Sequence, residues 1–350
     1  MLPQGEEAMG AAPTIFRELI QEDDLPVPSP LTLADIDAAA GALAGRVAVT
    51  PTVPCDGPEL AARLGAGTSV FLKLELFQRT GSFKARGALL NVLALDEEGR
   101  RRGVTAISAG NHAVAVAWAA RAAGTHAKVV MIASANPYRV ELTRRYGAEV
   151  VFAPTAHEGF AQVDEVVRTE GRTLIHPFDG RLTALGTAGV GRELMAQAPG
   201  LEAVVVPVGG GGLLAGVASA VKLVDPRCAV FGVEPEGADS MHRSLAAGEP
   251  RGIERVATIA DSLGAPYALP YSFELCRRNT DEVVLVNDDA LRDAMRLLQR
   301  EAKLAVEPAG AATTAALLGP LRERLAGKRV GLVVCGANID AVTYARLLGA

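Results

Sequence analysis

Short apolar runs alternate with longer segments of mixed polarity along most of this chain. Brief runs rich in Val, Ile and Ala are typical of buried strands, and apolar residues that recur every three or four positions are typical of helices. After an apolar run at 70–74, the pattern predicts strands at Val104–Ile107, Lys128–Ile132, Glu149–Phe152, Thr173–Ile175, Ala203–Val208, Ala229–Glu234, Val283–Val286 and Arg329–Cys335. It predicts helices at about 32–44 and at Pro58–Leu64, His112–Ala123, Pro137–Tyr146, Gly159–Thr169, Thr183–Gln197, Leu213–Val224, Asp288–Lys303, Pro308–Leu325 and Ile339–Leu348.

Strands that alternate with helices predict an α/β fold, in which helices cover the faces of a parallel sheet. Ligands bind such sheets beyond the carboxyl ends of the strands. Polar or glycine-rich segments follow four of the predicted strands, after Ile107, Val208, Glu234 and Val334, so we expect the functional site there. Residues 1–30 are mixed in charge and rich in proline toward their end, which predicts an N-terminal extension.

One lysine occupies an unusual place. The segment 75–87 follows the apolar run at 70–74. It contains a predicted turn at residues 80–82 and then a predicted helix, and Lys84 lies in the first turn of that helix. The positive end of the helix dipole disfavours a cation there, so we expect the pKa of Lys84 to be lowered. A partly neutral amine is a nucleophile that can form a Schiff base with an aldehyde. The alternative interpretation is a solvated surface lysine.

Ser108-Ala109-Gly110-Asn111-His112 follows one predicted strand and begins a helix. Backbone N–H groups at the start of a helix favour an anion such as a carboxylate. An ordinary strand-to-helix turn, capped by Ser108 or Asn111, is an equally good explanation.

Gly209-Gly210-Gly211-Gly212-Leu213 forms a second strand-to-helix turn. Consecutive glycines let backbone amides approach a ligand closely, which favours phosphate binding. Gly210, Gly212 and Ala215 also fit the dinucleotide fingerprint, and Glu234 lies where a ribose-binding acid would follow. A nicotinamide-dependent oxidoreductase is therefore an alternative, but it gives Lys84 no role.

Three other segments could contribute to a site. A carboxylate at Glu234, a turn carbonyl at Ala238 and the Ser240 hydroxyl could surround a cation, although a solvated turn is as good an interpretation. Glu307 precedes Pro308 at a predicted helix start, where simple helix capping would explain it. Cys335 ends the last predicted strand, where a cysteine is most often a small apolar residue.

Composition narrows the class of protein. The chain has 350 residues, of which 49% are hydrophobic and 21% charged, with a net charge of −5 and no basic block. We therefore expect a globular protein that does not bind nucleic acid. The longest uncharged run, 203–221, contains Pro207 and four glycines, so we expect no membrane span. The four cysteines are far apart, so we expect neither disulfides nor a zinc site. The N-terminus lacks an apolar core, so we expect no signal peptide. Both observations predict a cytoplasmic location.

Taken together, the motifs resemble the threonine/serine dehydratase group of pyridoxal-phosphate enzymes, which have the tryptophan-synthase-β (type II) fold. The resemblance runs from about Leu31 to the end and rests on Gly81–Lys84, Ser108–His112, His176–Asp179, Gly209–Gly212, Val233–Pro235, Glu307–Gly310 and Cys335–Asn338. It implies two parallel-sheet domains with the cofactor in the cleft between them. The large domain would comprise residues 31–102 and 180–350, and a small mobile domain residues 103–179.

The resemblance also implies roles for individual residues. Lys84 matches the lysine that binds pyridoxal phosphate covalently, with Phe83 against the cofactor ring and Asn111 hydrogen-bonded to the ring hydroxyl. The remaining cofactor contacts would come from Gly209, Gly210, Gly211, Gly212, Leu213 and Cys335. The substrate carboxylate would be held by Ser108, Ala109, Gly110, Asn111 and His112. A cation site would comprise Glu234, Ala238 and Ser240, and the serine at its last position favours a monovalent ion such as K⁺.

The chemistry implied is α,β-elimination of a β-hydroxy amino acid such as L-threonine or L-serine, giving a 2-oxo acid and ammonia. A buried thiol at Cys335 cannot keep the cofactor's pyridine nitrogen protonated, which disfavours transamination. Related racemases have serine where this chain has Ala109, and alanine has no proton to give, so we expect little racemisation.

Two segments depart from the family pattern, 259–266 and 184–187, and both are expected near the entrance of the site. The alternatives are therefore a hydroxyaspartate dehydratase, a β-replacement enzyme of the same fold, and, in other classes, the oxidoreductase or a non-catalytic binder. We expect a homodimer or homotetramer acting on a small amino acid. Because the chain ends soon after Asn338, we expect no regulatory domain like that of biosynthetic threonine dehydratases.

Overall fold

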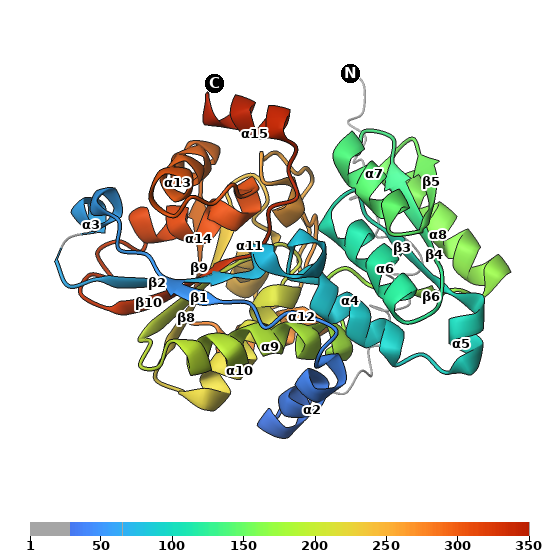
Figure 1. The fold of residues 1–350 in the computed structure, drawn as a ribbon, viewed down its shortest axis with the longest axis horizontal. Coiled ribbons are helices and arrows are strands. Elements are labelled where there is room, and N and C mark those ends of the chain that lie inside the picture. Colours follow the sequence, from blue (N-terminus) through green and yellow to red (C-terminus); the bar gives the residue numbers. More distant parts are fainter. Residues whose placement is uncertain (1–28, 65, 350) are drawn as a thin grey trace, which may run out of the picture.

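The computed structural model describes residues 29–64 and 66–349, which form two separate β-sheets covered by helices (Figure 1). The larger sheet has the strand order β1-β2-β10-β7-β8-β9, in which only the β1–β2 pair is antiparallel. The smaller sheet has the order β5-β4-β3-β6 and is parallel throughout. The predicted α/β class with two parallel sheets is confirmed.

The strands are β1 Thr52–Pro54, β2 Ser69–Leu74, β3 Val104–Ile107, β4 Ala127–Ile132, β5 Glu149–Ala153, β6 Thr173–Leu174, β7 Ala203–Pro207, β8 Ala229–Pro235, β9 Glu282–Val286 and β10 Arg329–Val334. The α-helices are α2 Leu33–Leu43, α3 Pro58–Leu64, α4 Lys84–Leu93, α5 Glu97–Arg102, α6 Asn111–Ala122, α7 Pro137–Arg145, α8 Ala156–Glu170, α9 Arg181–Gln197, α10 Gly212–Val224, α11 Ser240–Ala247, α12 Pro270–Asn279, α13 Asp288–Glu301, α14 Pro308–Leu318 and α15 Ala341–Leu348. Short 3-10 turns lie at η1 Glu75–Phe77, η2 Arg79–Gly81 and η3 Asp261–Leu263.

The predicted strands and helices are all present, with small differences at their ends. One helix is shorter than predicted, because α14 ends at Leu318, where Gly319 and Pro320 cannot continue it. Helix α2 begins with a capping box formed by Thr32 and Asp35. The elements missed by sequence reasoning are short: β1, α5, α11 and α12.

Residues 104–174 supply the four strands of the small sheet, and the large sheet is built from segments on either side. In Figure 1 the small sheet, with α6, α7 and α8, lies to the right of the large sheet. We propose that these are the two predicted domains, with their boundaries near residues 103 and 179. Of the predicted extension at 1–30, residues 1–28 lie outside the described part of the chain.

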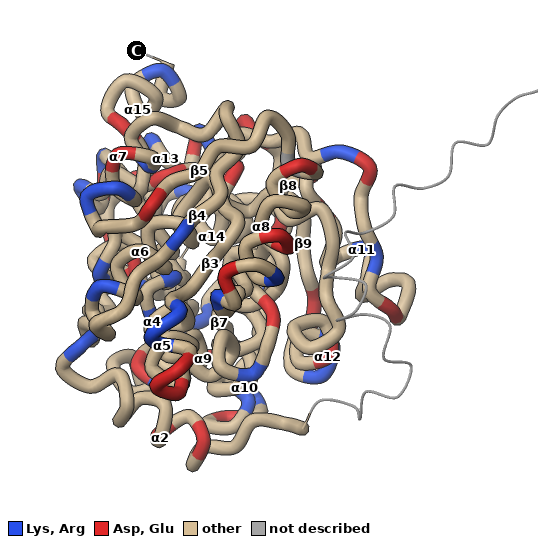
Figure 2. Tube along the Cα trace, turned by 90° about the vertical axis from the view of Figure 1, so that its right-hand side faces the viewer, with Lys and Arg blue, Asp and Glu red and all other residues tan. Residues whose placement is uncertain are grey.

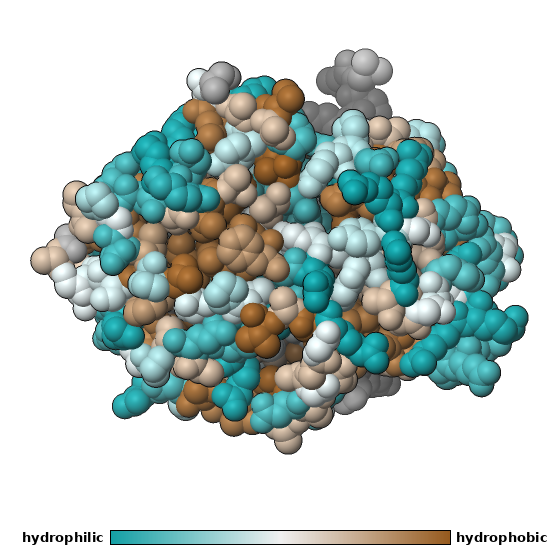
Figure 3. Space-filling model, viewed as in Figure 1, coloured by the Kyte–Doolittle hydropathy of each residue, from teal (hydrophilic) through white to brown (hydrophobic). Residues whose placement is uncertain are grey.

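Charged residues of both signs are interspersed along the chain trace, with no continuous basic stripe in the view of Figure 2. Hydrophilic and hydrophobic side chains mix on the face shown in Figure 3, with a hydrophobic area near its centre. Among the described residues, no helix combines the length and apolarity needed to cross a membrane.

Candidate functional site

A cavity of about 660 Å³ is lined by residues that follow strands of both sheets. Its volume lies within the range of about 300–1,000 Å³ typical of small-molecule sites. The predicted site residues that line it are Phe83, Lys84, Ser108, Ala109, Gly110, Asn111, Gly209, Gly210, Gly211, Gly212, Leu213 and Cys335. The fold therefore brings together residues that lie far apart in the sequence, as expected for the carboxyl ends of parallel strands.

A strained turn delivers Lys84 to this cavity. Thr80 and Gly81 both have positive φ angles, 66° and 72°, and Thr80 is one of two described non-glycine residues in that region. The Asn338 side chain donates a hydrogen bond to the Thr80 carbonyl (2.7 Å), and the Phe83 N–H donates to the Cys335 carbonyl (3.2 Å). These bonds tie the turn before Lys84 to the segment that follows β10, the neighbour of β2 in the sheet.

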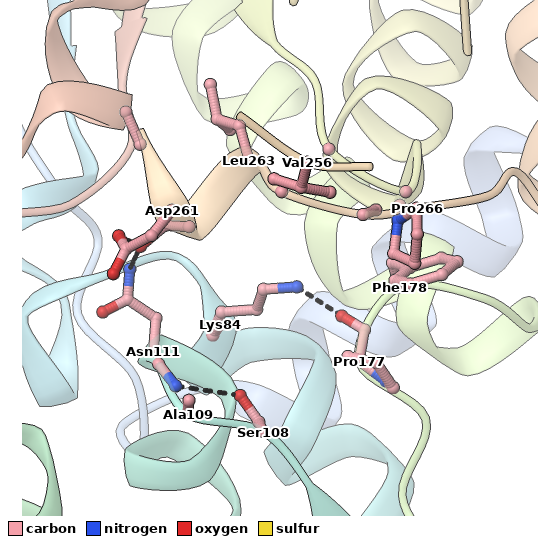
Figure 4. A pocket seen from close by; sticks show the side chains of 18 of the residues that line it. Lys84, Ser108, Ala109, Asn111, Pro177, Phe178, Val256, Asp261, Leu263 and Pro266 are labelled. Atoms are coloured by element: carbon pink, nitrogen blue, oxygen red, sulfur yellow. Dashed lines mark hydrogen bonds between the residues drawn. The ribbon is translucent and has the colours of Figure 1, made fainter. Parts of the chain in front are cut away.

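Lys84 is the first residue of α4, and its Nζ donates a hydrogen bond to the Pro177 carbonyl (Figure 4). Burial lowers the pKa of Lys84 to about 8. The predicted lowering of the pKa is therefore present, but its main cause is desolvation rather than the helix dipole. The amine is substantially neutral near pH 8, so it can act as a nucleophile or a base.

The glycine turn is shaped by close packing as well as by its open backbone. A Cβ on Gly210 would lie 2.2 Å from the Phe178 ring, and one on Gly212 would lie 2.3 Å from the Phe178 carbonyl oxygen. Gly211 has a φ of +93°, and a Cβ there would meet Met241 at 2.5 Å. Packing against Phe178 thus accounts for Gly210 and Gly212, and packing against Met241 together with a positive φ accounts for Gly211. The same turn still presents the N-terminus of α10 to the cavity.

The Ser108–Asn111 segment presents the N-terminus of α6 to the same cavity. The Ser108 hydroxyl accepts a hydrogen bond from the Gly110 N–H (3.1 Å). His112 is different: its ring does not line this cavity, and its Nε2 lies 2.8 Å from the Ile175 carbonyl. Burial lowers the pKa of His112 to about 3, so the ring is neutral. A side-chain contact of His112 with substrate therefore has no support in this structure.

A buried polar network was missed by sequence reasoning. The Asn111 amide donates to Glu307 (2.6 Å) and accepts from Asn338 (2.7 Å). Glu307 also accepts from Arg139 (3.2 Å), whose guanidinium donates to Asp261 (2.6 and 3.2 Å). The helix-capping interpretation of Glu307 is wrong, because its side chain makes no capping bond to α14. Only the position of Arg139 beyond the end of a parallel strand could have signalled its role.

Cys335 lies at the wall of the cavity and is 2% exposed. Burial raises the pKa of this thiol well above its usual value, with a further contribution from the charge of Glu307. The group is therefore a neutral thiol at physiological pH. This is the state that the sequence analysis assumed for the residue facing the pyridine nitrogen.

The residues of the predicted cation site lie outside the cavity. The Glu234 carboxylate accepts hydrogen bonds from the Met241 and His242 N–H groups (2.9 and 2.7 Å), so it caps the start of α11. Burial raises the pKa of Glu234 to about 8. The Ser240 hydroxyl donates to the Ala265 carbonyl (3.0 Å). Among the described residues, no cluster of three His, Cys, Asp or Glu side chains suited to a metal ion is found, and a K⁺ site made with backbone oxygens stays a prediction.

The two departures from the family pattern have different positions. Residues 261–266 line the cavity, as expected for its entrance. Residues 184–187 instead lie within α9, where Gly186 packs against Gly87 of α4 and the Thr187 hydroxyl donates to the Gly212 carbonyl (2.8 Å). This segment supports the glycine turn from behind, so its expected place at the entrance is wrong.

The residues present fit a phosphorylated aldehyde cofactor. An amine with a lowered pKa and a helix N-terminus built of glycines face one cavity, and a neutral thiol lies at its wall. The helix N-terminus suits a phosphate, and the amine suits an aldehyde carbon. The dinucleotide interpretation gives Lys84 no role in this arrangement.

Comparisons with known proteins give the same result. Residues 43–336 match the family described as "Pyridoxal-phosphate dependent enzyme". Phenylserine dehydratase from Ralstonia pickettii is 58% identical over 81% of this chain and 87% of its own length. L-threonine ammonia-lyase from Thermotoga maritima is 39% identical over 81% of this chain and 70% of its own. The structure of maize serine racemase matches with a TM-score of 0.86 and 34% identity, over 91% of this chain and 97% of that one.

The matched region contains every predicted residue of the cavity. Membership of this family thus accounts for the presence of the buried amine of Lys84, the glycine turn and the Cys335 thiol in one cavity. The chain belongs to the family of pyridoxal-phosphate dependent enzymes and, as the resemblance predicted, to its threonine/serine dehydratase group.

Proposed function

We propose that this enzyme removes water from a β-hydroxy amino acid by α,β-elimination and releases a 2-oxo acid and ammonia. The observation that carries the proposal is Lys84, a lysine of lowered pKa inside a cavity that also holds two helix N-termini. The Cα–H and Cβ–O bonds break and water leaves. The resulting enamine then reacts with another water to give the two products.

The cofactor would be held by Lys84 covalently, by the amides of Gly209–Gly212 at its phosphate, and by Phe83, Asn111, Leu213 and Cys335 around its ring. When bound, pyridoxal phosphate supplies an electron-withdrawing ring that stabilises negative charge at the substrate Cα. Residues Ser108–Asn111 would bind the substrate carboxylate, because the N-terminus of α6 provides N–H donors there.

Lys84 would also take the Cα proton. With a pKa of about 8, its Nζ is neutral in about one molecule in ten at pH 7 and in half of the molecules at pH 8, and the neutral form can accept a proton. The Pro177 carbonyl, which accepts a hydrogen bond from Nζ, fixes the orientation of the amine. Cys335, which would face the pyridine nitrogen of the cofactor, is too weak an acid to protonate that nitrogen. This favours rapid loss of the β-hydroxyl over reactions that need a long-lived carbanion.

The preferred substrate would carry a large uncharged group at Cβ, such as the phenyl ring of phenylserine. In Figure 4, Val256 and Leu263 lie on one side of Lys84, while Ser108, Ala109 and Asn111 lie on the other. Phe160 and Phe178 line the same cavity. Apolar side chains opposite the carboxylate-binding helix suit an aromatic substituent. The 58% identity to a phenylserine dehydratase supports this choice over threonine or serine.

A monovalent cation such as K⁺ would bind at Glu234, Ala238 and Ser240. The support is indirect: the Ser240 hydroxyl contacts Ala265 in the segment that lines the cavity, so an ion there would stabilise the cavity wall. We further propose a homodimer or homotetramer in the cytoplasm. The four cysteines are unpaired and buried, which suits a reducing compartment, and the exposed Val49 and Phe77 offer an apolar surface for a second copy.

The test is a panel of β-hydroxy amino acids assayed for 2-oxo acid release by the purified holoenzyme, with and without potassium. We expect turnover of phenylserine, with slower turnover of threonine and serine. Formation of no 2-oxo acid from any of the three would refute the proposed reaction. Light scattering on the same sample gives the number of chains in the assembly.

A further inference from the structure

The guanidinium of Arg139 lies at the wall of the cavity and is held there by several protein groups. Its Nη1 and Nη2 donate to the two oxygens of Asp261 (2.6 and 3.2 Å). Nη2 also donates to Glu307 (3.2 Å), and Nε donates to the Asn338 carbonyl (3.0 Å). The Arg139 side chain is 6% exposed. These bonds occupy Nε, Nη2 and one N–H of Nη1, and the two carboxylates already balance the positive charge of the guanidinium.

The charges around the cavity leave nothing to neutralise a second carboxylate. Among the described residues that line it, Lys84 and Arg139 are the only Lys or Arg side chains, and Asp261 and Glu307 are the only acids. Lys84 is required for the chemistry proposed above. The α6 N-terminus would be occupied by the substrate's own carboxylate. A further carboxylate on Cβ would therefore enter a cavity in which the charge of the one remaining cation, Arg139, is already balanced by two acids.

The two acids differ in what else holds them. Glu307 is 1% exposed and is fixed by Asn111 as well as by Arg139. Asp261 is 61% exposed and lies in the short turn η3, on the same side of Lys84 as Asn111 in Figure 4. The charge of Asp261 can therefore be removed without burying an unpaired group, and its removal frees the outer side of the Arg139 guanidinium.

We propose that Asp261 is a specificity-determining residue, which occupies Arg139 and so excludes substrates that carry a second carboxylate. The site then selects β-hydroxy amino acids with an uncharged Cβ substituent over 3-hydroxyaspartate. This inference rests on the proposed function and adds to it the charge of the acceptable substrate.

The experiment compares kcat/KM for phenylserine and for 3-hydroxyaspartate in the wild-type holoenzyme and in three variants. Asp261→Asn should shift the ratio at least tenfold toward 3-hydroxyaspartate, and Asp261→Glu, which keeps the charge, should stay close to wild type. Asp289→Asn is the matched control, because it removes the same charge from a surface pair with Arg292, in which Asp289 is 92% exposed. It should leave the ratio unchanged.

A binding measurement gives a second readout that needs no turnover. By calorimetry, succinate should bind the Asp261→Asn holoenzyme at least tenfold more tightly than wild type, whereas butyrate, with one carboxylate, should show no such gain. An unchanged ratio and unchanged succinate affinity in Asp261→Asn would overturn the inference, as would a wild-type enzyme that uses both substrates equally. If the wild type releases no 2-oxo acid from any neutral substrate, the proposed function fails, and the succinate result alone then decides the inference.

Discussion

Replacing Arg86 with methionine should destabilise the fold strongly. Arg86 lies two residues after Lys84, is 2% exposed, and donates two hydrogen bonds to Glu75 (2.9 and 2.8 Å). It donates two more to Glu193 (2.7 and 2.9 Å). Glu75 is fully buried, and without Arg86 its carboxylate keeps the hydrogen bond from the Thr50 hydroxyl and the nearby charge of Lys73 but loses its ion pair.

Removing one partner of a buried ion pair costs about 3–5 kcal/mol, because the other charge stays buried without compensation. Lys73 continues to pair with Glu193 (2.6 Å), so the penalty falls mainly on Glu75. We therefore expect a loss at the lower end, about 3 kcal/mol. The control is Arg300→Met, since Arg300 pairs with Glu59 at the surface with side chains 45% and 37% exposed. Such pairs contribute about 0–1 kcal/mol.

Urea unfolding followed by circular dichroism measures the free energy of unfolding of each variant. Adding Glu75→Gln to Arg86→Met removes the uncompensated charge, so the double variant should recover at least about 1 kcal/mol relative to Arg86→Met alone. If Arg86→Met lost no more stability than Arg300→Met, the buried network would not hold α4 in place and the reasoning would be refuted.

Three other predictions concern the cavity. The reaction of cofactor-free enzyme with pyridoxal phosphate should speed up as pH rises through about 8, because the Lys84 amine loses its proton there. Stopped-flow absorbance measures the rate of this reaction, and a rate that still rises toward pH 10.5 would show that the pKa of the lysine is not lowered. Ala109 has no proton to give to the second face of Cα, so chiral chromatography of residual substrate should show racemisation far slower than deamination, and Ala109→Ser should increase it. Gly212→Ala would place a Cβ 2.3 Å from the Phe178 carbonyl oxygen, so the affinity for the cofactor, measured by absorbance titration, should fall at least tenfold. The control is Gly41→Ala, whose new Cβ has no atom within 4 Å, and this variant should bind the cofactor normally. Equal affinity of the two variants would show that the glycine turn tolerates a side chain.

Much of the fold follows from local pattern. Strands such as β7, which is buried along its whole length, give uninterrupted apolar runs, and helices such as α7 begin at a recognisable cap, Asn136. The missed elements have weak signals: β1 is a three-residue edge strand that contains a proline, and α11 begins at Ser240, inside a segment that resembled a turn. Such elements are defined by their partners in space rather than by their own residues.

The site was predictable where chemistry is concentrated in short motifs, as at Lys84 and Gly209–Gly212. It was not predictable where residues of separate segments act on one another. Arg139 and Asp261 are 122 positions apart and belong to different motifs or to none, so no local pattern joins them. The cause of the lowered Lys84 pKa was likewise hidden, because burial depends on the whole cavity and not on the first turn of α4.

The most direct test of the central claim identifies the lysine that carries the cofactor. The chain has six lysines, so borohydride reduction of the holoenzyme followed by peptide mapping can distinguish them. The cofactor should be found on Lys84, and the wild-type protein should be yellow before reduction. Lys73 is the internal comparison, because it is fully buried and paired with Glu193. Label on Lys73, or a colourless protein that takes up no pyridoxal phosphate, would contradict the assignment of Lys84.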